Sequence, residues 1–228
     1  MKKILIVETN VSTYGTTEKP TGLWLGELIH FYDEIAKMNY DVDFVSPSGG
    51  YVPIDPVSMK YADSIDYKWY RNKMFVDKAL SNTRKPEEID PHAYHAIYYT
   101  GGHGVLWDFV ENQALKQIAE TIYEQNGIIS AVCHGVVGLL PLCGGNGCPL
   151  LKNKRVTGFT NTEEWLSQKR KLVPFSTENA LKEKGAIYSK KRFFTSYAIE
   201  DQRIITGQNP WSPKAVAKLL IQKLEETV

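Results

Sequence analysis

The sequence is poor in cysteine, with three in 228 residues, at positions 133, 143 and 148. An odd and small number of cysteines argues against a disulfide-stabilised secreted scaffold and is typical of a reducing compartment, so we expect a cytoplasmic protein. Cys143 and Cys148 flank a glycine-rich stretch, but no second pair of ligands lies nearby in the sequence. We therefore expect a hairpin with two free thiols and no structural zinc.

The sequence also lacks a strong net charge and a long apolar run. Lys and Arg number 27 and Asp and Glu 26, which gives a net charge of +1. Nothing in this balance indicates a nucleic-acid partner, and no apolar window approaches the length of a membrane span, so no membrane partner is expected. Internal repeats and low-complexity segments are absent. The length therefore suits one large α/β domain with a well-filled core.

Strand and helix patterns alternate from the start of the chain. Residues 3–8 form a continuous apolar run, and residues 23–38 place apolar side chains at helical spacing. In residues 41–46, polar and apolar side chains alternate as in a strand. This β-α-β opening predicts a doubly wound α/β fold with a mostly parallel sheet. Later strands are expected at 96–100, 128–132, 154–157, 193–197 and 204–206, and later helices at 105–125, 176–184 and 213–225.

The stretch from residue 47 to residue 91 breaks this alternation. It carries Pro and Gly at its start and Pro at its end, with aromatic and charged residues between them. A connection of this length inside a compact domain is usually a functional lid or cap. Its aromatic side chains at 67, 69, 70 and 75 suit either a pocket or an interface on the one hand or a satellite core on the other, and the sequence leaves both open.

Residues 127–140 read GIISAVCHGVVGLL and place Cys133 between a buried strand and a helix-like apolar stretch. A cysteine at such a turn lies beside the free N–H groups of a helix N-terminus, so we expect it to be partly exposed and ionised. The small residues Ala131 and Gly135 suit a cramped nucleophile elbow. The alternative is a buried cysteine that acts as a small hydrophobe, but the adjacent His134 favours a reactive one.

The stretch AVCHG at 131–135 resembles the nucleophile motif of the PfpI superfamily, which has the class I glutamine-amidotransferase-like fold. The most similar branch is the heat-shock chaperone and glutathione-independent glyoxalase III group. This resemblance implies a flavodoxin-like three-layer sandwich with a mostly parallel central sheet. It also implies a single domain over residues 1–228 and a homodimer. The lid-like insertion at about 47–91 rests on the length of that connection, where the resemblance is weakest.

Further stretches match the family in its order. Glu27, in TGLWLGE, occupies the position of the family's glutamate beside the reactive cysteine. On the residues alone, an exposed helix carboxylate is the alternative, and the resemblance favours a buried catalytic one. Residues 53–56 with Ser58 resemble a substrate-side loop, and residues 206–210 the family's last loop. On the same helix, His30 and Glu34 are four apart, and we expect an exposed ion pair there and not a metal pair.

The GGHG stretch at 101–104 follows an expected strand and resembles the family's oxyanion loop. The resemblance implies that the backbone N–H groups of Gly102 and His134 face the substrate oxygen, with Gly101 and His103 in the same substrate-binding region. For His103 we expect a structural or pocket-lining role.

An acidic residue that follows the Gly-Phe-Thr segment at 158–160 is expected to orient His134. In the family branch this residue stands at a fixed interval after the segment, and that spacing selects Glu164, with Glu163 as its rival. The alternative is a helix N-terminus with acidic residues after a capping Thr, and both roles can hold together.

The resemblance implies an enzyme that converts 2-oxoaldehydes such as methylglyoxal to 2-hydroxy acids in carbonyl detoxification. It would be a glyoxalase III-like lyase, of the D-lactate dehydratase type. Its catalytic residues would be Cys133, His134, Glu27 and Glu164, with no metal, cofactor or glutathione required. The sequence leaves open a stress holdase that captures unfolded clients, and a Cys-dependent amidase, peptidase or deglycase.

Overall fold

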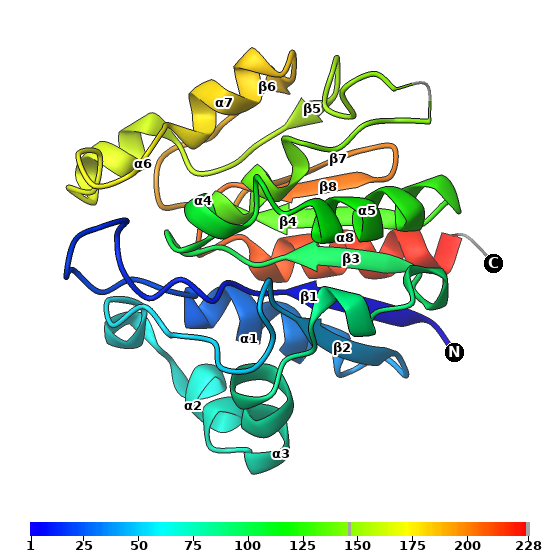
Figure 1. The fold of residues 1–228 in the computed structure, drawn as a ribbon, viewed down its shortest axis with the longest axis horizontal. Helices are drawn as coiled ribbons and strands as arrows, with labels where there is room; N and C mark the ends of the chain where they lie inside the picture. The colour runs from blue at the N-terminus through cyan, green and yellow to red at the C-terminus, as the bar shows by residue number, and fades with distance from the viewer. Residues whose placement is uncertain (146, 227–228) are drawn as a thin grey trace.

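Six strands form the central sheet, in the order β2-β1-β3-β4-β8-β7 (Figure 1). The structure is a computed structural model, and it describes residues 1–145 and 147–226. Five strands run parallel and only β7 is antiparallel to its neighbour. The predicted α/β fold with a mostly parallel sheet is confirmed. The strands are β1 Lys3–Val7, β2 Asp41–Val45, β3 Ala96–Tyr99, β4 Ile128–Val132, β7 Ala198–Asp201 and β8 Ile204–Gly207.

Helices connect and cover these strands, and a separate pair of short strands lies outside the sheet. The pair is β5 Arg155–Val156 and β6 Ile187–Tyr188, which run parallel. The α-helices are α1 Leu25–Ile35, α2 Ser64–Tyr70, α3 Lys73–Val76, α4 Val105–Asp108, α5 Gln113–Glu124, α6 Asn161–Leu166, α7 Thr177–Glu183 and α8 Pro213–Glu226. The other turns of helix are η1 Ser58–Tyr61, η2 Asp77–Ser81, η3 Pro86–Glu88, η4 Pro91–Ala93 and η5 Cys133–Leu139.

The sheet is buried on both faces because successive side chains of a strand point to opposite sides. In β1, Ile4 and Ile6 belong to the apolar cluster that contains α1 and α8 residues, whereas Leu5 and Val7 belong to the cluster that contains α5 and η5 residues. The continuous apolar run of the sequence therefore serves two cores. The result is the expected three-layer sandwich.

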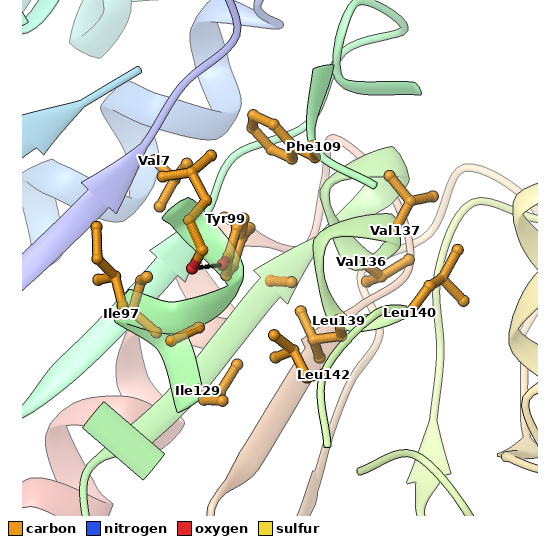
Figure 2. Packing of buried hydrophobic residues seen from close by; sticks show 14 of the residues in the cluster. Val7, Ile97, Tyr99, Phe109, Ile129, Val136, Val137, Leu139, Leu140 and Leu142 are labelled. Atoms are coloured by element: carbon orange, nitrogen blue, oxygen red, sulfur yellow. Dashed lines mark hydrogen bonds between the residues drawn. The ribbon is translucent and has the colours of Figure 1, made fainter. Parts of the chain in front are cut away.

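The apolar residues that follow Cys133 anchor the turn on which it lies. Figure 2 shows Val136, Leu139 and Leu142 near Ile97, Tyr99 and Ile129 of the sheet. All of these side chains are at most 1% exposed. Removing this packing would cost several kcal/mol at each large side chain, so the position of the turn is rigidly fixed.

Two predicted elements are wrong. The helix expected at 105–125 is two helices, because α4 ends at Asp108 and the Asn112 side chain caps a new helix at Leu115 N, at 2.9 Å. The strand expected at 193–197 is absent, and β7 begins at Ala198. Phe194 has a φ of 52° and its N–H donates to Glu163, so this segment cannot join a ladder.

The segment from 47 to 91 is made of short helices more than of loop. Trp69 and Phe75 pack against Tyr32 in the apolar core beneath α1, whereas Tyr67 and Tyr70 are exposed. The inner half of the aromatic cluster therefore has a core role, as part of the apolar cluster that contains α1 and α8 and not as a separate satellite core. A lid action of this segment stays a prediction.

No helix within residues 1–145 and 147–226 is both long and apolar enough to cross a membrane. All three cysteines are outside disulfides, as expected. The glycine-rich hairpin predicted between Cys143 and Cys148 includes Asn146, which lies outside the described residues.

Candidate active site

Cys133 lies at the carboxyl end of β4, where the strand turns abruptly into η5. Its φ of 57° is in the left-handed region, which costs energy for any residue with a Cβ and is common at functional turns. Gly135 makes this turn possible, because a Cβ there would stand 2.3 Å from the carbonyl oxygen of Thr100. The nucleophile elbow expected from the small neighbours is therefore the observed backbone, although a 3-10 helix and not an α-helix follows it.

The expectation that Cys133 is partly exposed and ionised is wrong. The residue is 2% exposed. Burial raises the pKa of the Cys133 thiol, and the Glu27 carboxyl raises it further, whereas the His134 backbone N–H lowers it. The helix N-terminus effect is therefore outweighed by desolvation, and the resting residue is a thiol that needs a base at the moment of attack.

His134 is placed to be that base. Its Nε2 lies 2.8 Å from Oε2 of Glu164, and its Nδ1 lies 3.4 Å from Sγ of Cys133. A carboxylate accepts, so Nε2 carries the proton and the lone pair of Nδ1 faces the sulfur. Burial, then the neighbouring His103, lowers the pKa of His134, so the ring is neutral near pH 7.

Glu164 is shared by two histidines. Its Oε1 accepts from Nε2 of His103 at 2.9 Å, and Nδ1 of His103 lies 3.1 Å from the hydroxyl of Tyr14. Burial opposes ionisation of Glu164, but the two imidazoles hold its pKa well below the usual range. His103 therefore donates to the carboxylate and accepts from Tyr14, which gives every polar atom of the group a partner.

The group of His103, His134 and Glu164 has the composition of a metal site, with ligand atoms within 4.8 Å of one another. Both imidazoles already make hydrogen bonds of 2.8–2.9 Å to the carboxylate. A metal ion would have to replace these hydrogen bonds, and it would bind the His134 ring that faces Cys133. The donor set therefore fits a hydrogen-bonded relay better than a cation.

Glu27 comes from α1, far from Cys133 in sequence, and meets it at the sheet edge. The residue is 0% exposed, and none of the described donors gives either carboxyl oxygen a hydrogen bond of good geometry. Burial raises the pKa of Glu27 to about 8, against smaller opposing effects of the Cys133 thiol and the Gly101 backbone. Glu27 is thus protonated at neutral pH and can donate to the sulfur or to a bound substrate.

The GGHG loop separates into two roles. A Cβ on Gly101 would stand 2.2 Å from Oε2 of Glu27 and 2.9 Å from Cβ of Cys133, so its absence lets these two side chains approach. Gly101 is not among the residues that line the cavity at Cys133, and its predicted place in the substrate-binding region stays a prediction. Gly102, with a φ of 102°, does line that cavity, and its oxyanion role stays a prediction.

Glu163 is buried beside Glu164 but faces a different set of partners. Its Oε2 accepts from the backbone and the hydroxyl of Thr160, in the capping box of α6. Its Oε1 accepts from Phe194 N, Gln208 Nε2 and Asn209 Nδ2, at 2.8–3.0 Å. Of the two candidates for the acid that orients His134, Glu164, which the spacing selects, contacts this histidine. Glu163 instead accepts hydrogen bonds from three separate loops.

Glu163 and Glu164 are expected to separate stability from catalysis. Glu164→Gln keeps an acceptor for His134. Its amide N–H can face His103 once that ring adopts the tautomer that donates from Nδ1 to the Tyr14 hydroxyl. The variant removes the charge that stabilises protonated His134, so we expect turnover to fall about 10- to 100-fold with little change in melting temperature. Glu163→Gln places an amide N–H against donors, which we expect to cost about 2 kcal/mol or more of stability.

Thermal unfolding and steady-state kinetics on the two variants would check this expectation. A silent Glu164→Gln together with a folded but inactive Glu163→Gln would mean that the orienting acid is Glu163.

A cavity of about 410 Å³ gives access to this group. Cys133, Gly102, His103 and His134 line its polar part, and Ser167, Gln168 and Lys169 line another side. Its remaining wall is largely aromatic and comes from separate segments of the chain: Tyr14, Trp24, Tyr61, Phe159, Phe194 and Trp211. The sequence alone did not single out these side chains, since only Trp24 and Phe159 stand inside a recognised motif.

Comparisons with known proteins show which family and which solved structures the chain is similar to. A sequence profile described as "DJ-1/PfpI family" matches residues 24–223. "Glyoxalase 3" of Candida albicans is 29% identical over 99% of each chain. "Glutathione-independent glyoxalase HSP31" of Saccharomyces cerevisiae is 28% identical over 98% of each chain. Among solved structures, Rapid Encystment Protein 24 KDa of Francisella tularensis is 39% identical, with a TM-score of 0.93 over 98% of this chain and 99% of that one.

Proposed function

The chain belongs to the DJ-1/PfpI family, and from this premise we propose that it is a glutathione-independent glyoxalase that converts 2-oxoaldehydes such as methylglyoxal to 2-hydroxy acids. The observation that carries the proposal is the pair formed by a buried thiol and a buried, protonated carboxyl, Cys133 and Glu27. A simple thiol hydrolase needs the thiol and its histidine. Moving a proton between two adjacent carbons needs the additional carboxyl.

The reaction begins with addition of Cys133 to the aldehyde carbon. As Sγ attacks, the thiol proton passes to Nδ1 of His134, and Glu164 stabilises the imidazolium that forms. Glu27 donates its proton to the former aldehyde oxygen, which completes a hemithioacetal. The substrate hydroxyl thus carries the Glu27 proton, and Glu27 is left as a carboxylate beside the C1 hydrogen.

Isomerisation and hydrolysis follow in the same site. The Glu27 carboxylate takes the proton from C1 while the His134 imidazolium protonates the C2 oxygen, which gives an enediol and returns His134 to its neutral form. Glu27 then gives its proton to C2 and takes the proton of the C1 hydroxyl, so that the ketone becomes an alcohol and C1 becomes the carbonyl of a thioester. Water, deprotonated by His134, then cleaves the C–S bond, and Cys133 leaves as a thiol. The sum is one 2-oxoaldehyde and one water in, and one 2-hydroxy acid out, with no external oxidant or reductant.

The cavity offers more room than methylglyoxal fills, and its wall is largely aromatic. Substrates with larger apolar substituents than a methyl group therefore fit the same site, with Trp24 and Trp211 as the contacts for the substituent.

A single assay tests the proposed function. Wild-type protein is incubated with methylglyoxal without glutathione, and lactate is measured by an enzyme-coupled assay; phenylglyoxal and a panel of aryl amides are run beside it. The proposal expects a 2-hydroxy acid from the aldehydes. Amide cleavage without lactate formation would establish the hydrolase alternative, and suppression of client aggregation without either activity would establish the holdase. The lyase class, the cytoplasmic location and a homodimer are further parts of the proposal.

The pH profile of kcat/KM follows from the two titrating groups. His134 must be neutral to accept the thiol proton, and its pKa is lowered from 6.5, so the acid limb is expected below that value. Glu27 must begin protonated, and its pKa is raised to about 8, so activity is expected to fall as pH rises through about 8. Kinetics from pH 5 to 10 would show both limbs. The residual activity of Glu27→Gln should not fall as pH rises through about 8. If the fall at alkaline pH persists in this variant, it comes from the titration of another group.

A further inference from the structure

Away from the active site, His30 of α1 faces two carboxylates of the segment from 47 to 91. Nε2 of His30 lies 3.3 Å from Oδ2 of Asp63 and 3.4 Å from Oδ2 of Asp66. The expected ion pair of His30 with Glu34 is wrong, because Glu34 pairs with Lys37 at 2.8 Å. The three side chains bring one ring nitrogen and two carboxylate oxygens within 4.8 Å of one another.

These contacts stand at ion-pair distance and leave the ring nitrogen without a hydrogen bond of good geometry. Nε2 of His30 and Oδ1 of Asp66 are both buried and both without a hydrogen-bond partner among the described residues. The Asp66 side chain is 3% exposed, so its orphaned oxygen cannot be satisfied by bulk water. This contrasts with the group at Glu164, where the same kinds of side chain satisfy one another at 2.8–2.9 Å.

The spacing matches tetrahedral coordination instead. Zinc binds histidine nitrogen and carboxylate oxygen at about 2.0–2.2 Å, so two ligand atoms of a tetrahedral site stand about 3.3–3.5 Å apart. Both measured separations from Nε2 lie at this value. A ring nitrogen with two carboxylate oxygens favours zinc over magnesium or calcium, which prefer oxygen alone.

The carboxylates are already held in place by backbone groups. Oδ1 of Asp63 accepts from Ile65 N and Asp66 N, and Oδ2 of Asp66 accepts from Asp63 N, in the capping box of α2. Oδ2 of Asp63 is left over for a ligand. The Asp63 side chain is 49% exposed, which gives an ion a path from solvent and leaves a fourth position for water.

We infer that His30, Asp63 and Asp66 form a binding site for one zinc ion that clamps α2 onto α1. The site is distinct from the catalytic group, and the inference does not depend on the proposed function. Because His30 stands one helical turn after Glu27, the clamp braces the helix that presents the catalytic carboxyl. Asp66, and to a smaller extent Asp63, raise the pKa of His30, so a proton competes with zinc for Nε2.

The test is a titration of the EDTA-stripped full chain with Zn²⁺ at pH 7.5 by calorimetry, repeated with Co²⁺ by absorption. We expect one site per chain, tetrahedral d–d bands and no thiolate charge-transfer band. His30→Gln and Asp63→Asn should each weaken binding at least tenfold. Asn keeps the helix cap, so Asp63→Asn should melt like the wild type in EDTA and remain informative if His30→Gln fails to fold.

Two matched controls separate this site from others. His92→Gln removes an exposed histidine elsewhere and should bind zinc as the wild type does, and so should Glu164→Gln. The inference is overturned if the wild type binds no zinc at 100 µM, if His30→Gln and Asp63→Asn bind as tightly as the wild type, or if Glu164→Gln abolishes binding.

Discussion

Glu27→Gln is expected to lower turnover of methylglyoxal about 10²- to 10⁴-fold, the range of general acid–base catalysis. Gln has nearly the same volume and can still donate a hydrogen bond toward the sulfur, but it cannot give up or take a proton at the substrate carbon. The side chain is 0% exposed, so no solvent group can substitute for it. The chemistry should therefore stop after Cys133 has captured the aldehyde.

The capture step offers an internal control for this variant. Limited alkylation followed by peptide mapping should show Cys133 modified in Glu27→Gln at a rate close to that of the wild type. Glu34→Gln, on the same helix and paired with Lys37, should keep wild-type turnover. Unchanged turnover in Glu27→Gln would make Glu27 a bystander, and the proton-shuttle mechanism would be wrong.

Local sequence patterns predicted most of the fold, because each pattern coincides with a physical requirement of its element. The apolar run of β1 serves two cores, and Ser176 caps α7 by accepting from Asn179 N. The failures came from contacts distant in sequence. The helical spacing of apolar residues suggests one helix at 105–125, but the chain breaks between α4 and α5. The spacing continues across the break because both helices bury side chains in the same core.

The candidate site was predictable where a motif fixes backbone and spacing. The glycine at 135 and the interval to Glu164 are local features, and the structure brings Cys133, His134 and Glu164 into contact. Burial was not predictable in the same way. Burial raises the pKa of Cys133 and the Glu27 carboxyl raises it further, and only the complete fold brings Glu27 and Gly101 to this cysteine.

The same reasoning explains what the sequence could not show about polar partners. Tyr14 is the partner of His103 across 89 positions, and Glu163, beyond its local capping box with Thr160, gathers donors from residues 194, 208 and 209. Neither role has a local signature, because a buried hydrogen bond is decided by which loops meet and not by the residues beside it in the chain.

The central claim is that one thiol, Cys133, carries the substrate through the reaction. Without its nucleophile, a site of this kind retains only positioning and electrostatic effects, so Cys133→Ala is expected to lose activity by at least about a thousandfold. The residue is small and its replacement by Ala removes a single buried atom, so the fold should persist. Cys143→Ala, which changes a thiol outside the site, should leave activity unchanged.

The decisive measurement is lactate formed from methylglyoxal, without glutathione, by wild type, Cys133→Ala and Cys143→Ala at equal concentrations of folded protein. The account predicts lactate from wild type and Cys143→Ala at equal rates, and none above background from Cys133→Ala. Lactate formed by Cys133→Ala at a rate near that of the wild type would contradict the account.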